Sequence, residues 1–245
     1  MKRQTLRKLI LFISFFFFPI TMFFLSPILP YEGIFHEGAA GILVGAMIIF
    51  ILQFIVSLFF GRAFCGWLAP CGAFQEIACS SVNNKPAKGG KLNLIKYAIW
   101  IPWLSGIVVG FAMIGGIKSV NFLFHTHFSL AYEEWGQLTI IYFFVSTIIV
   151  GLALIFGRRA FCHYVCWMSP LMIIGTKIKN FIKLPSLRLK ADKTKCISCK
   201  ICTKNCQMSL DVEYMVKNDK MDQAECILCG ACVDFCPKKV IKFGL

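Results

Sequence analysis

Acidic residues and histidines are scarce in this chain. It carries 12 Asp and Glu against 26 Lys and Arg, and only four His among 245 residues. The sequence also contains no P-loop, no dinucleotide-binding fingerprint, no Ser/His/Asp set and no paired catalytic carboxylates. These absences disfavour nucleotide-dependent and hydrolytic enzymes, and they favour a component that works with other proteins over a stand-alone enzyme.

Charge is absent altogether from four long stretches. A helix needs about 20 apolar residues to cross the hydrocarbon core of a bilayer, and 58% of this chain is hydrophobic, against roughly 45–50% in soluble domains. The uncharged stretches lie between Lys8 and Glu32, Glu37 and Arg62, Lys96 and Lys118, and Glu134 and Arg158. The sequence therefore predicts an all-α membrane domain with four spans over residues 1–175.

Lys and Arg are distributed unevenly between the predicted loops. The N-terminus, the connection 62–96 and the tail after Arg158 are basic, whereas the connections 32–37 and 118–134 hold more acids than bases. Because basic loops stay in the cytoplasm, we expect a multi-pass protein of the cytoplasmic (inner) membrane with both termini inside. The formal charge of +14 then indicates contact with anionic lipid, and nothing in its pattern indicates nucleic acid. The first stretch lacks a small-x-small cleavage site, which favours a retained span over a signal peptide.

A basic segment, 176–190, follows the predicted membrane domain. Five Lys and Arg alternate there with Ile, Phe and Leu, and Pro185 interrupts any helix near its middle. It is either a solvated linker or, as we prefer, a segment that lies on the inner leaflet.

The tail, 191–245, contains two CxxCxxCxxxC runs. Three cysteines spaced two residues apart can converge on one iron–sulfur cubane, and in two-cluster ferredoxins the fourth cysteine of each run binds the other cluster. We therefore assign one [4Fe–4S] cluster to Cys196, Cys199, Cys202 and Cys236, and a second to Cys226, Cys229, Cys232 and Cys206. Zinc ribbons usually pair CxxC knuckles across longer loops. The tail resembles bacterial two-cluster ferredoxins, which implies a small α+β domain, although Gln207 stands where that motif usually has Pro.

Two further cysteine pairs follow the second and fourth uncharged stretches. The motifs span 61–82 and 157–170, and each contains Arg-Ala-Phe-Cys, ending at Cys65 and at Cys162. The pattern indicates a parallel repeat of two-helix units. The second cysteines are out of register, because Cys71 comes six residues after Cys65 and Cys166 four after Cys162.

If the two repeats pack together, their four cysteines meet at the cytoplasmic edge of the membrane. Cys65, Cys71, Cys162 and Cys166 are thus a candidate third redox site, holding a further Fe–S cluster or metal. Two alternatives stay open, namely a redox-active thiol pair and buried small apolar residues. Arg62, Arg158 and Arg159 are either lipid anchors or countercharges for such a site, and Cys79 has no assignment.

The four histidines give little information about function. None lies in an uncharged stretch, which disfavours haem held between helices. His36, His125 and His127 fall in predicted outer loops, where His125 and His127 are either ordinary loop residues or ligands for an outside metal. His163 is either an interface residue or a group that tunes a cluster at Cys162.

Two Cys-containing loops on a four-helix membrane domain, followed by a two-cluster ferredoxin, resemble the polytopic membrane ferredoxin-type family. The usual family motif is CxxxCP, whereas here Trp167 follows Cys166 and Cys71 lies after Pro70. The resemblance implies electron transfer at the membrane. We expect electrons to pass between the ferredoxin domain and a membrane-edge site, quinone, metal or partner protein such as a ferredoxin or oxidoreductase subunit. The alternative is a transporter or metal-cofactor assembly factor with a redox-sensing Fe–S domain.

Overall fold

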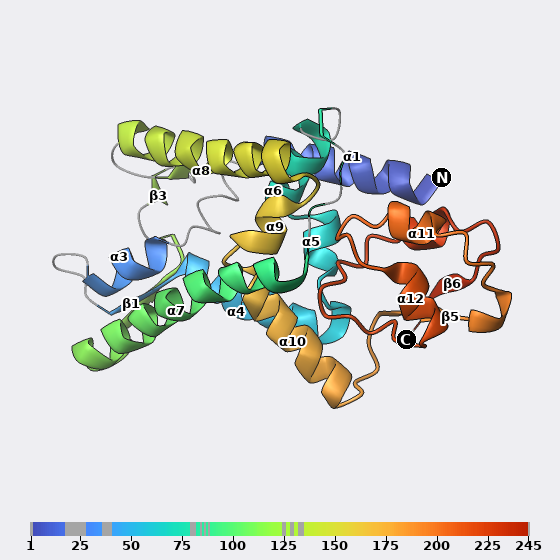
Figure 1. Cartoon of the computed structure of the whole chain (residues 1–245). Coiled ribbons are helices and arrows are strands. Elements are labelled where there is room, and N and C mark those ends of the chain that lie inside the picture. The colour runs from blue at the N-terminus through green and yellow to red at the C-terminus, as the bar shows by residue number, and fades with distance from the viewer. Residues whose placement is uncertain are drawn as a thin grey trace.

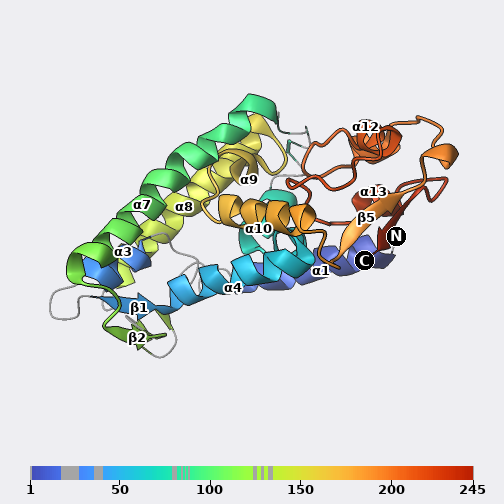
Figure 2. The same ribbon diagram turned by 90° about the horizontal axis from the view of Figure 1, so that it is seen from below.

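The chain forms an elongated helical part with a smaller α/β part at one end, and both termini lie at that end (Figures 1 and 2). The structure is a computed structural model. It describes residues 2–17, 28–35, 41–78, 82–83, 85, 87, 89–123, 126–127, 130–131 and 135–244, with backbone only at several of them, 135–142 included. Cys79, His36 and His125 therefore lie outside the described residues.

The helical part is built from the uncharged stretches and the segments next to them. Continuous runs of Leu, Ile, Phe and Val favour helices whose backbone polar groups are all paired internally. The helices are α1 (Lys2–Phe16), α3 (Leu29–Phe35), α4 (Gly45–Phe60), α7 (Ile95–Ile114), α8 (Trp135–Phe156) and α10 (Ser169–Phe181). Helix α7 ends at Gly115, whose φ of +86° is the left-handed conformation that commonly closes a helix.

Short strands occur at the end of the helical part that lies away from the termini (Figure 2). Strand β1 (Ile42–Val44) pairs in parallel with β2 (Ser119–Asn121), and β3 (Thr126–His127) pairs antiparallel with β4 (Leu130–Ala131). The prediction of an all-α domain was wrong here. Within the second uncharged stretch, Ile42-Leu43-Val44 forms a strand because these residues favour extended backbone, and α4 has 16 residues.

Only part of the predicted membrane domain has helices of spanning length. Among the described residues, one continuous helical stretch, Gly90–Ile114, is long and apolar enough to cross a bilayer. Helix α4 and the part of α8 from Phe143 to Phe156 are apolar but shorter. The stretch Gly90–Ile114 begins as the 3₁₀ helix η2 (Gly90–Leu94) and continues as α7.

The two cysteine motifs fold into short helices at the end of the helical part that meets the α/β part (Figure 1). The first motif forms α5 (Ala63–Trp67), α6 (Pro70–Ala73) and the π-helical turn η1 (Phe74–Ala78). The second forms α9 (Ala160–Tyr164) and leads into α10.

The α/β part is closed by a two-stranded antiparallel sheet that joins its first and last segments. Strand β5 (Arg188–Ala191) pairs with β6 (Ile241–Gly244), so that Arg188 faces Gly244. Between them lie η3 (Lys193–Lys195), α11 (Ile201–Lys204), α12 (Val212–Lys217) and α13 (Ala231–Asp234). This architecture agrees with the predicted α+β ferredoxin-type domain.

The segment 176–190 is divided between two elements and is not an independent linker. Helix α10 continues to Phe181, and β5 begins at Arg188. The Lys179 side chain is buried and its Nζ donates a hydrogen bond to the Leu187 carbonyl oxygen at 2.8 Å. The exposed fraction of Phe181 is 90%, so an apolar side chain remains on the surface between the two parts.

Candidate redox site

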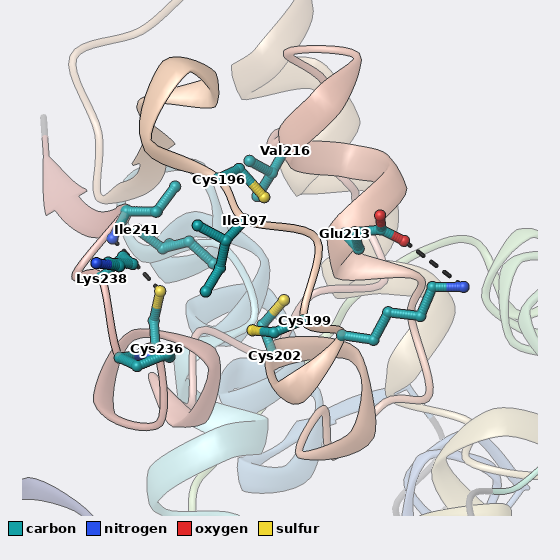
Figure 3. Close-up of a pocket in the computed structure, with 12 residues that line it drawn as sticks. Cys196, Ile197, Cys199, Cys202, Glu213, Val216, Cys236, Lys238 and Ile241 are labelled. Carbon is teal, nitrogen blue, oxygen red and sulfur yellow. Dashed lines mark hydrogen bonds and ion pairs between the residues drawn. The ribbon is translucent and has the colours of Figure 1, made fainter.

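Four cysteines of the α/β part line one cavity. They are Cys196, Cys199 and Cys202 from the first run and Cys236 from the second. Figure 3 shows their side chains grouped around the same space, with Ile197 between them and Val216 beside Cys196.

A second cavity is lined by the other four cysteines of this part, Cys206, Cys226, Cys229 and Cys232. The fourth cysteine of each run thus lies with the first three of the other run, which is the grouping that the sequence predicted. Cys199 is exposed, whereas Cys229 and Cys232 are buried. The second cavity is therefore the more enclosed of the two.

The backbone around the two cavities repeats itself. Within each CxxCxxC run, the residue before the second cysteine and the residue after it both have positive φ: Ser198 (+57°) and Lys200 (+57°) in the first, Leu228 (+50°) and Gly230 (+74°) in the second. Left-handed residues at these positions turn the chain sharply around the space between the cysteines. Only one of the four is a glycine, so the loops hold strained backbone that a bound group would stabilise.

The fourth cysteines accept equivalent hydrogen bonds. The backbone N–H of Leu210 donates to Cys206 Sγ, and that of Val240 donates to Cys236 Sγ, each at 3.4 Å. Among the described residues no three His, Cys, Asp or Glu side chains converge on a single metal ion. Soft thiolates spread around a cavity, with N–H donors to sulfur, fit a multi-iron cluster better than one ion.

The Arg-Ala-Phe-Cys repeat is also a structural repeat. Helices α5 and α9 each contain five residues, and each ends with nearly the same backbone angles, φ −121° and ψ −22° at Leu68 and φ −120° and ψ −26° at Val165. Ala69 and Cys166 then donate backbone N–H groups to equivalent carbonyl oxygens, on Phe64 and Phe161. Ala69 is thus the structural equivalent of Cys166, and Cys71 lies outside the repeat.

All four motif cysteines are nevertheless buried together. Cys65, Cys71, Cys162 and Cys166 have exposed fractions between 4% and 6%. Burial raises the pKa of the Cys166 thiol to about 12, and the nearby Cys162 and Cys65 raise it further. Burial also raises the pKa of Cys71, and its electrostatic coupling to Cys166 exceeds that to the other two. Cys71 and Cys166 pack in one apolar group, and Cys65 and Cys162 pack in another.

Polar groups surround these thiols. Gln75, which is 1% exposed, donates its Nε2 to the Cys71 carbonyl oxygen at 2.9 Å and to Cys162 Sγ at 3.4 Å. Its Oε1 accepts the backbone N–H of Phe161 at 3.1 Å. Gln75 therefore ties the first motif to the second beside a sulfur atom.

Arg159 belongs to a buried ion-pair network beside the same thiols. Its guanidinium contacts Glu76, donates to the Cys65 carbonyl oxygen at 2.9 Å and lies 3.9 Å from Cys162 Sγ. Glu76 also pairs with Arg7 of α1 at 2.7 Å. Burial alone would raise the pKa of Glu76, but Arg159 and Arg7 together hold it below its ordinary value.

Arg62, the repeat counterpart of Arg159, joins the motif to the α/β part. It is fully buried, and its Nη1 pairs with Glu225 at 2.6 Å while its Nη2 donates to Ser169 Oγ at 2.8 Å. Lys96, also fully buried, pairs with the other Glu225 oxygen at 2.6 Å. Arg62 and Arg159 are therefore countercharges inside the protein, and neither is a lipid anchor.

The second cavity lies directly against the motif cysteines. Cys65 and Cys162 pack in one apolar group with Cys229, Cys206 and intervening side chains of Ile227, Met172 and Met208. Met172 Sδ lies 3.5 Å from Cys65 Sγ. The cysteines of the motifs and those of the second cavity thus form one continuous sulfur-rich region.

His163 lies within this region, but its ring is buried and uncharged. Its Nδ1 lies 2.9 Å from Asn93 Oδ1, and the ring is 1% exposed. Burial lowers the pKa of His163 to about 4, so the ring is neutral at physiological pH. Arg158 donates to the Lys204 carbonyl oxygen at 3.1 Å, and His127 is described only as part of β3.

The sequence did not identify the two carboxylates, Glu225 and Glu76, that pair with the buried arginines. Glu76 carried a weak signal, because it is the one acid in the basic connection 62–96. Glu225 precedes Cys226 in an ordinary mixed-charge segment, and nothing local marks it.

Comparison with protein families agrees with this geometry. Residues 195–241 match the model of a 4Fe-4S dicluster domain. Residues 42–84 and 138–185 match a 4Fe-4S binding domain, and these two segments contain all four motif cysteines.

Known proteins resemble the chain over most of its length. Protein MJ0750 of Methanocaldococcus jannaschii is 28% identical over 99% of this chain and 96% of its own. The putative electron transport protein YccM of Escherichia coli is 25% identical over 78% of this chain, and the chain spans 53% of its length. The ferredoxin-type protein NapH of Haemophilus influenzae is 24% identical over 85% of this chain and 70% of its own. No solved structure matches the chain.

Proposed function

Because the chain belongs to the family of ferredoxin-type iron–sulfur electron-transport proteins, we propose that it passes electrons between its two-cluster domain and the buried motif cysteines at a membrane edge. In this proposal it is an electron-transfer component that works with other redox proteins. The names of YccM and NapH, an electron transport protein and a ferredoxin-type protein, support this placement.

The eight cysteines of the α/β part bind two [4Fe–4S] clusters in this proposal. Cys196, Cys199, Cys202 and Cys236 hold the first, and Cys226, Cys229, Cys232 and Cys206 hold the second. The two cavities that these residues line, and the repeated left-handed turns around them, support the assignment. When bound, each cluster carries one electron at a time.

The order of the sites follows from their contacts. Cys206 and Cys229 of the second cavity pack in one group with Cys65 and Cys162, whereas no residue that lines the first cavity belongs to that group. The path therefore runs from the first cavity through the second to the motif cysteines. The packing of Cys229 and Cys206 on the motif cysteines is the observation that carries the proposal, because electron tunnelling falls steeply with distance.

The motif cysteines bind a third iron–sulfur cluster, with Cys65, Cys71, Cys162 and Cys166 as its ligands. Burial raises the thiol pKa of Cys65, Cys71 and Cys166, which disfavours the thiol-exchange alternative at these three, because the thiolate is the reactive form. Packing alone does not explain two buried arginines and a buried glutamine beside them, since burying a polar group is costly. Arg62, Arg159 and Gln75 instead suit a group of negative charge.

The helical part is a four-span membrane domain in this proposal, with both termini on the cytoplasmic side. Several large apolar side chains of α7 are exposed, Val108, Val109 and Met113 among them at 55–79%, which suits contact with lipid. Arg3 of α1 pairs with Asp234, so the N-terminal helix and the ferredoxin domain lie at the same end. This contact supports the predicted orientation.

An apolar cavity of about 380 Å³ lies between α4, α7 and α10. Trp167, which follows Cys166 in the chain, lines it together with Trp100 and Trp103. The cavity suits the apolar ring and tail of a quinone, which would exchange electrons with the third site. A partner subunit or a metal ion at this edge is the alternative acceptor or donor.

Iron and sulfide analysis tests the proposal. The purified protein should contain about 12 iron atoms, four for each cluster, and a Cys65→Ser/Cys162→Ser variant about eight, with one EPR signal lost. Cys79→Ser is the matched control and should keep all the iron. About eight iron atoms in both the wild type and the double variant would exclude the third cluster and leave the two-cluster domain intact.

A further inference from the structure

Two loops form the exposed rim of the first cysteine cavity. Residues 193–200 carry two of its cysteines, Cys196 and Cys199, and residues 235–239 carry Cys236. Ile197 at the centre is 58% exposed and Cys199 is exposed, whereas Cys229 and Cys232 of the second cavity are each 8% exposed. A redox protein in solution can therefore approach the first cavity closely, while the helical part covers the second.

This rim is basic. The two loops contain five lysines, Lys193, Lys195, Lys200, Lys238 and Lys239, and neither loop contains an acid. Lys195 pairs with Asp192 at 2.8 Å, and Lys200 lies 3.9 Å from Glu213. Within the described part of the chain, Lys193 and Lys239 have no ion-pair partner, and both are exposed.

The charge of a bound cluster accounts for only part of this pattern. Lys200 and Lys238 line the cavity, so part of their positive charge lies beside the cysteines. Lys193 and Lys239 do not line it, and their ammonium groups extend into solvent. Two unpaired cations beside an exposed isoleucine instead suit the rim of a transient protein interface, where complementary charges steer the encounter.

We propose that this face, residues 193–200 and 235–239, docks an acidic protein that carries single electrons. Surface carboxylates of the carrier pair with Lys193 and Lys239, and an apolar patch covers Ile197. In each encounter one electron moves between the carrier and the site held by Cys196, Cys199, Cys202 and Cys236, so that one partner is oxidised and the other reduced. The inference rests on the proposed function, because it takes the first cavity as the outer end of the path.

The test uses the full-length, cluster-loaded protein in nanodiscs of neutral phosphatidylcholine, with oxidised flavodoxin as the acidic probe. A Lys193→Glu/Lys239→Glu variant is compared with Lys204→Glu/Lys220→Glu, which has the same net charge and changes exposed lysines of the same domain outside the two loops. We expect the first variant to raise the Kd for flavodoxin roughly ten-fold at low salt and to flatten its salt dependence. The control should stay within about two-fold of the wild type.

Equal dissociation constants for the two variants would overturn the proposal, as would a wild type that does not bind flavodoxin at low salt. Both variants should keep the iron content and EPR signals of the wild type, which shows that they fold. Binding is measured with oxidised proteins, so it does not depend on electrons reaching the motif cysteines. Loss of the third cluster from the proposed function would therefore leave this result unchanged.

Discussion

The indole Nε1 of Trp67 donates a hydrogen bond to the carbonyl oxygen of Leu228 at 3.1 Å. Trp67 ends α5 of the first cysteine motif, and Leu228 precedes Cys229 in the cluster loop, residues 225–230, of the second cavity. This bond crosses the junction between the helical part and the α/β part. It is joined by Gln4 of α1, whose Nε2 donates to the Cys229 carbonyl oxygen at 3.0 Å. The junction therefore holds the second cavity at a fixed place beside Cys65.

Gly66 allows the closest approach at this junction. A Cβ atom at Gly66 would lie 2.2 Å from the Ile227 carbonyl oxygen, closer than real atoms approach. Gly66→Ala should therefore push the cluster loop away from α5 and slow electron transfer from the second cluster to the motif site by about ten-fold or more. Flash reduction, followed by rapid-freeze EPR of each cluster, measures that rate.

Gly151→Ala is the matched control for this substitution. Gly151 lies in α8, and beyond its own helix backbone no atom of the described residues lies within 4 Å of a Cβ placed there. This variant should transfer electrons at the wild-type rate. A Gly66→Ala protein with an unchanged rate and full iron content would show that the junction does not set the path.

The grouping of the tail cysteines around two cavities could be predicted because it depends mainly on their spacing along the chain. Three cysteines spaced by two residues fix one side of a cavity, and the family rule supplies the fourth. The displaced Cys71 could not be placed in this way. Its position depends on Pro70, which starts a new short helix after the repeat has ended and turns Cys71 back toward Cys166.

The ion-pair partners of Arg62 and Arg159 also could not be predicted from the neighbouring sequence. Glu225 lies 163 residues after Arg62, and Glu76 lies 83 residues before Arg159. A buried arginine and a lipid-anchoring arginine have the same sequence surroundings, namely the end of an apolar stretch. Only the tertiary packing of the two motifs on each other and on the cluster loop distinguishes them.

Glu76 stabilises the buried arginines, and its removal should lower the free energy of unfolding strongly. Glu76→Gln leaves Arg7 and Arg159 buried without a countercharge, which costs about 3–5 kcal/mol. For a chain of this size the Tm should fall by about 10 °C, measured by thermal unfolding in detergent. Asp219→Asn, an exposed carboxylate in a turn, is the control and should leave the Tm unchanged.

The same carboxylate gives the stability a pH dependence. The arginines hold the pKa of folded Glu76 below its ordinary value, so its contribution is fully present above the unfolded pKa of about 4.3. It is lost as the pH falls through the lower, folded pKa. The difference in Tm between wild type and Glu76→Gln should therefore shrink on acidification below pH 4. A difference that is constant from pH 7 to pH 3 would contradict this role.

The crossed assignment of the fourth cysteines can be tested with one pair of variants. Cys236 lines the first cavity, although the other three cysteines of its run line the second. Cys236→Ser should therefore perturb the cluster held by Cys196, Cys199 and Cys202, and Cys206→Ser the one held by Cys226, Cys229 and Cys232. Because the first cluster is the exposed one, EPR line broadening by a water-soluble relaxation agent identifies which signal each variant loses. If Cys236→Ser lost the buried, unbroadened signal, the assignment would be wrong.

If the motif cysteines hold the proposed third cluster, we expect Gln75 to raise its reduction potential through the hydrogen bond that Nε2 donates to Cys162 Sγ. An N–H donor stabilises the more negative, reduced state, so Gln75→Met should make the reduction potential of this site more negative. A hydrogen bond contributes about 1 kcal/mol, which at about 2.3 kcal/mol per 100 mV is roughly 40 mV for one electron. EPR-monitored redox titration measures the shift.

Gln53→Met is the matched control, because Gln53 is a buried glutamine whose amide has no hydrogen-bond partner in the described part of the chain. In the Gln53→Met variant, the reduction potential of the motif site should stay at the wild-type value. An equal shift in both variants would mean that the potential depends on the general polarity of the helical part and not on the contact between Gln75 and Cys162.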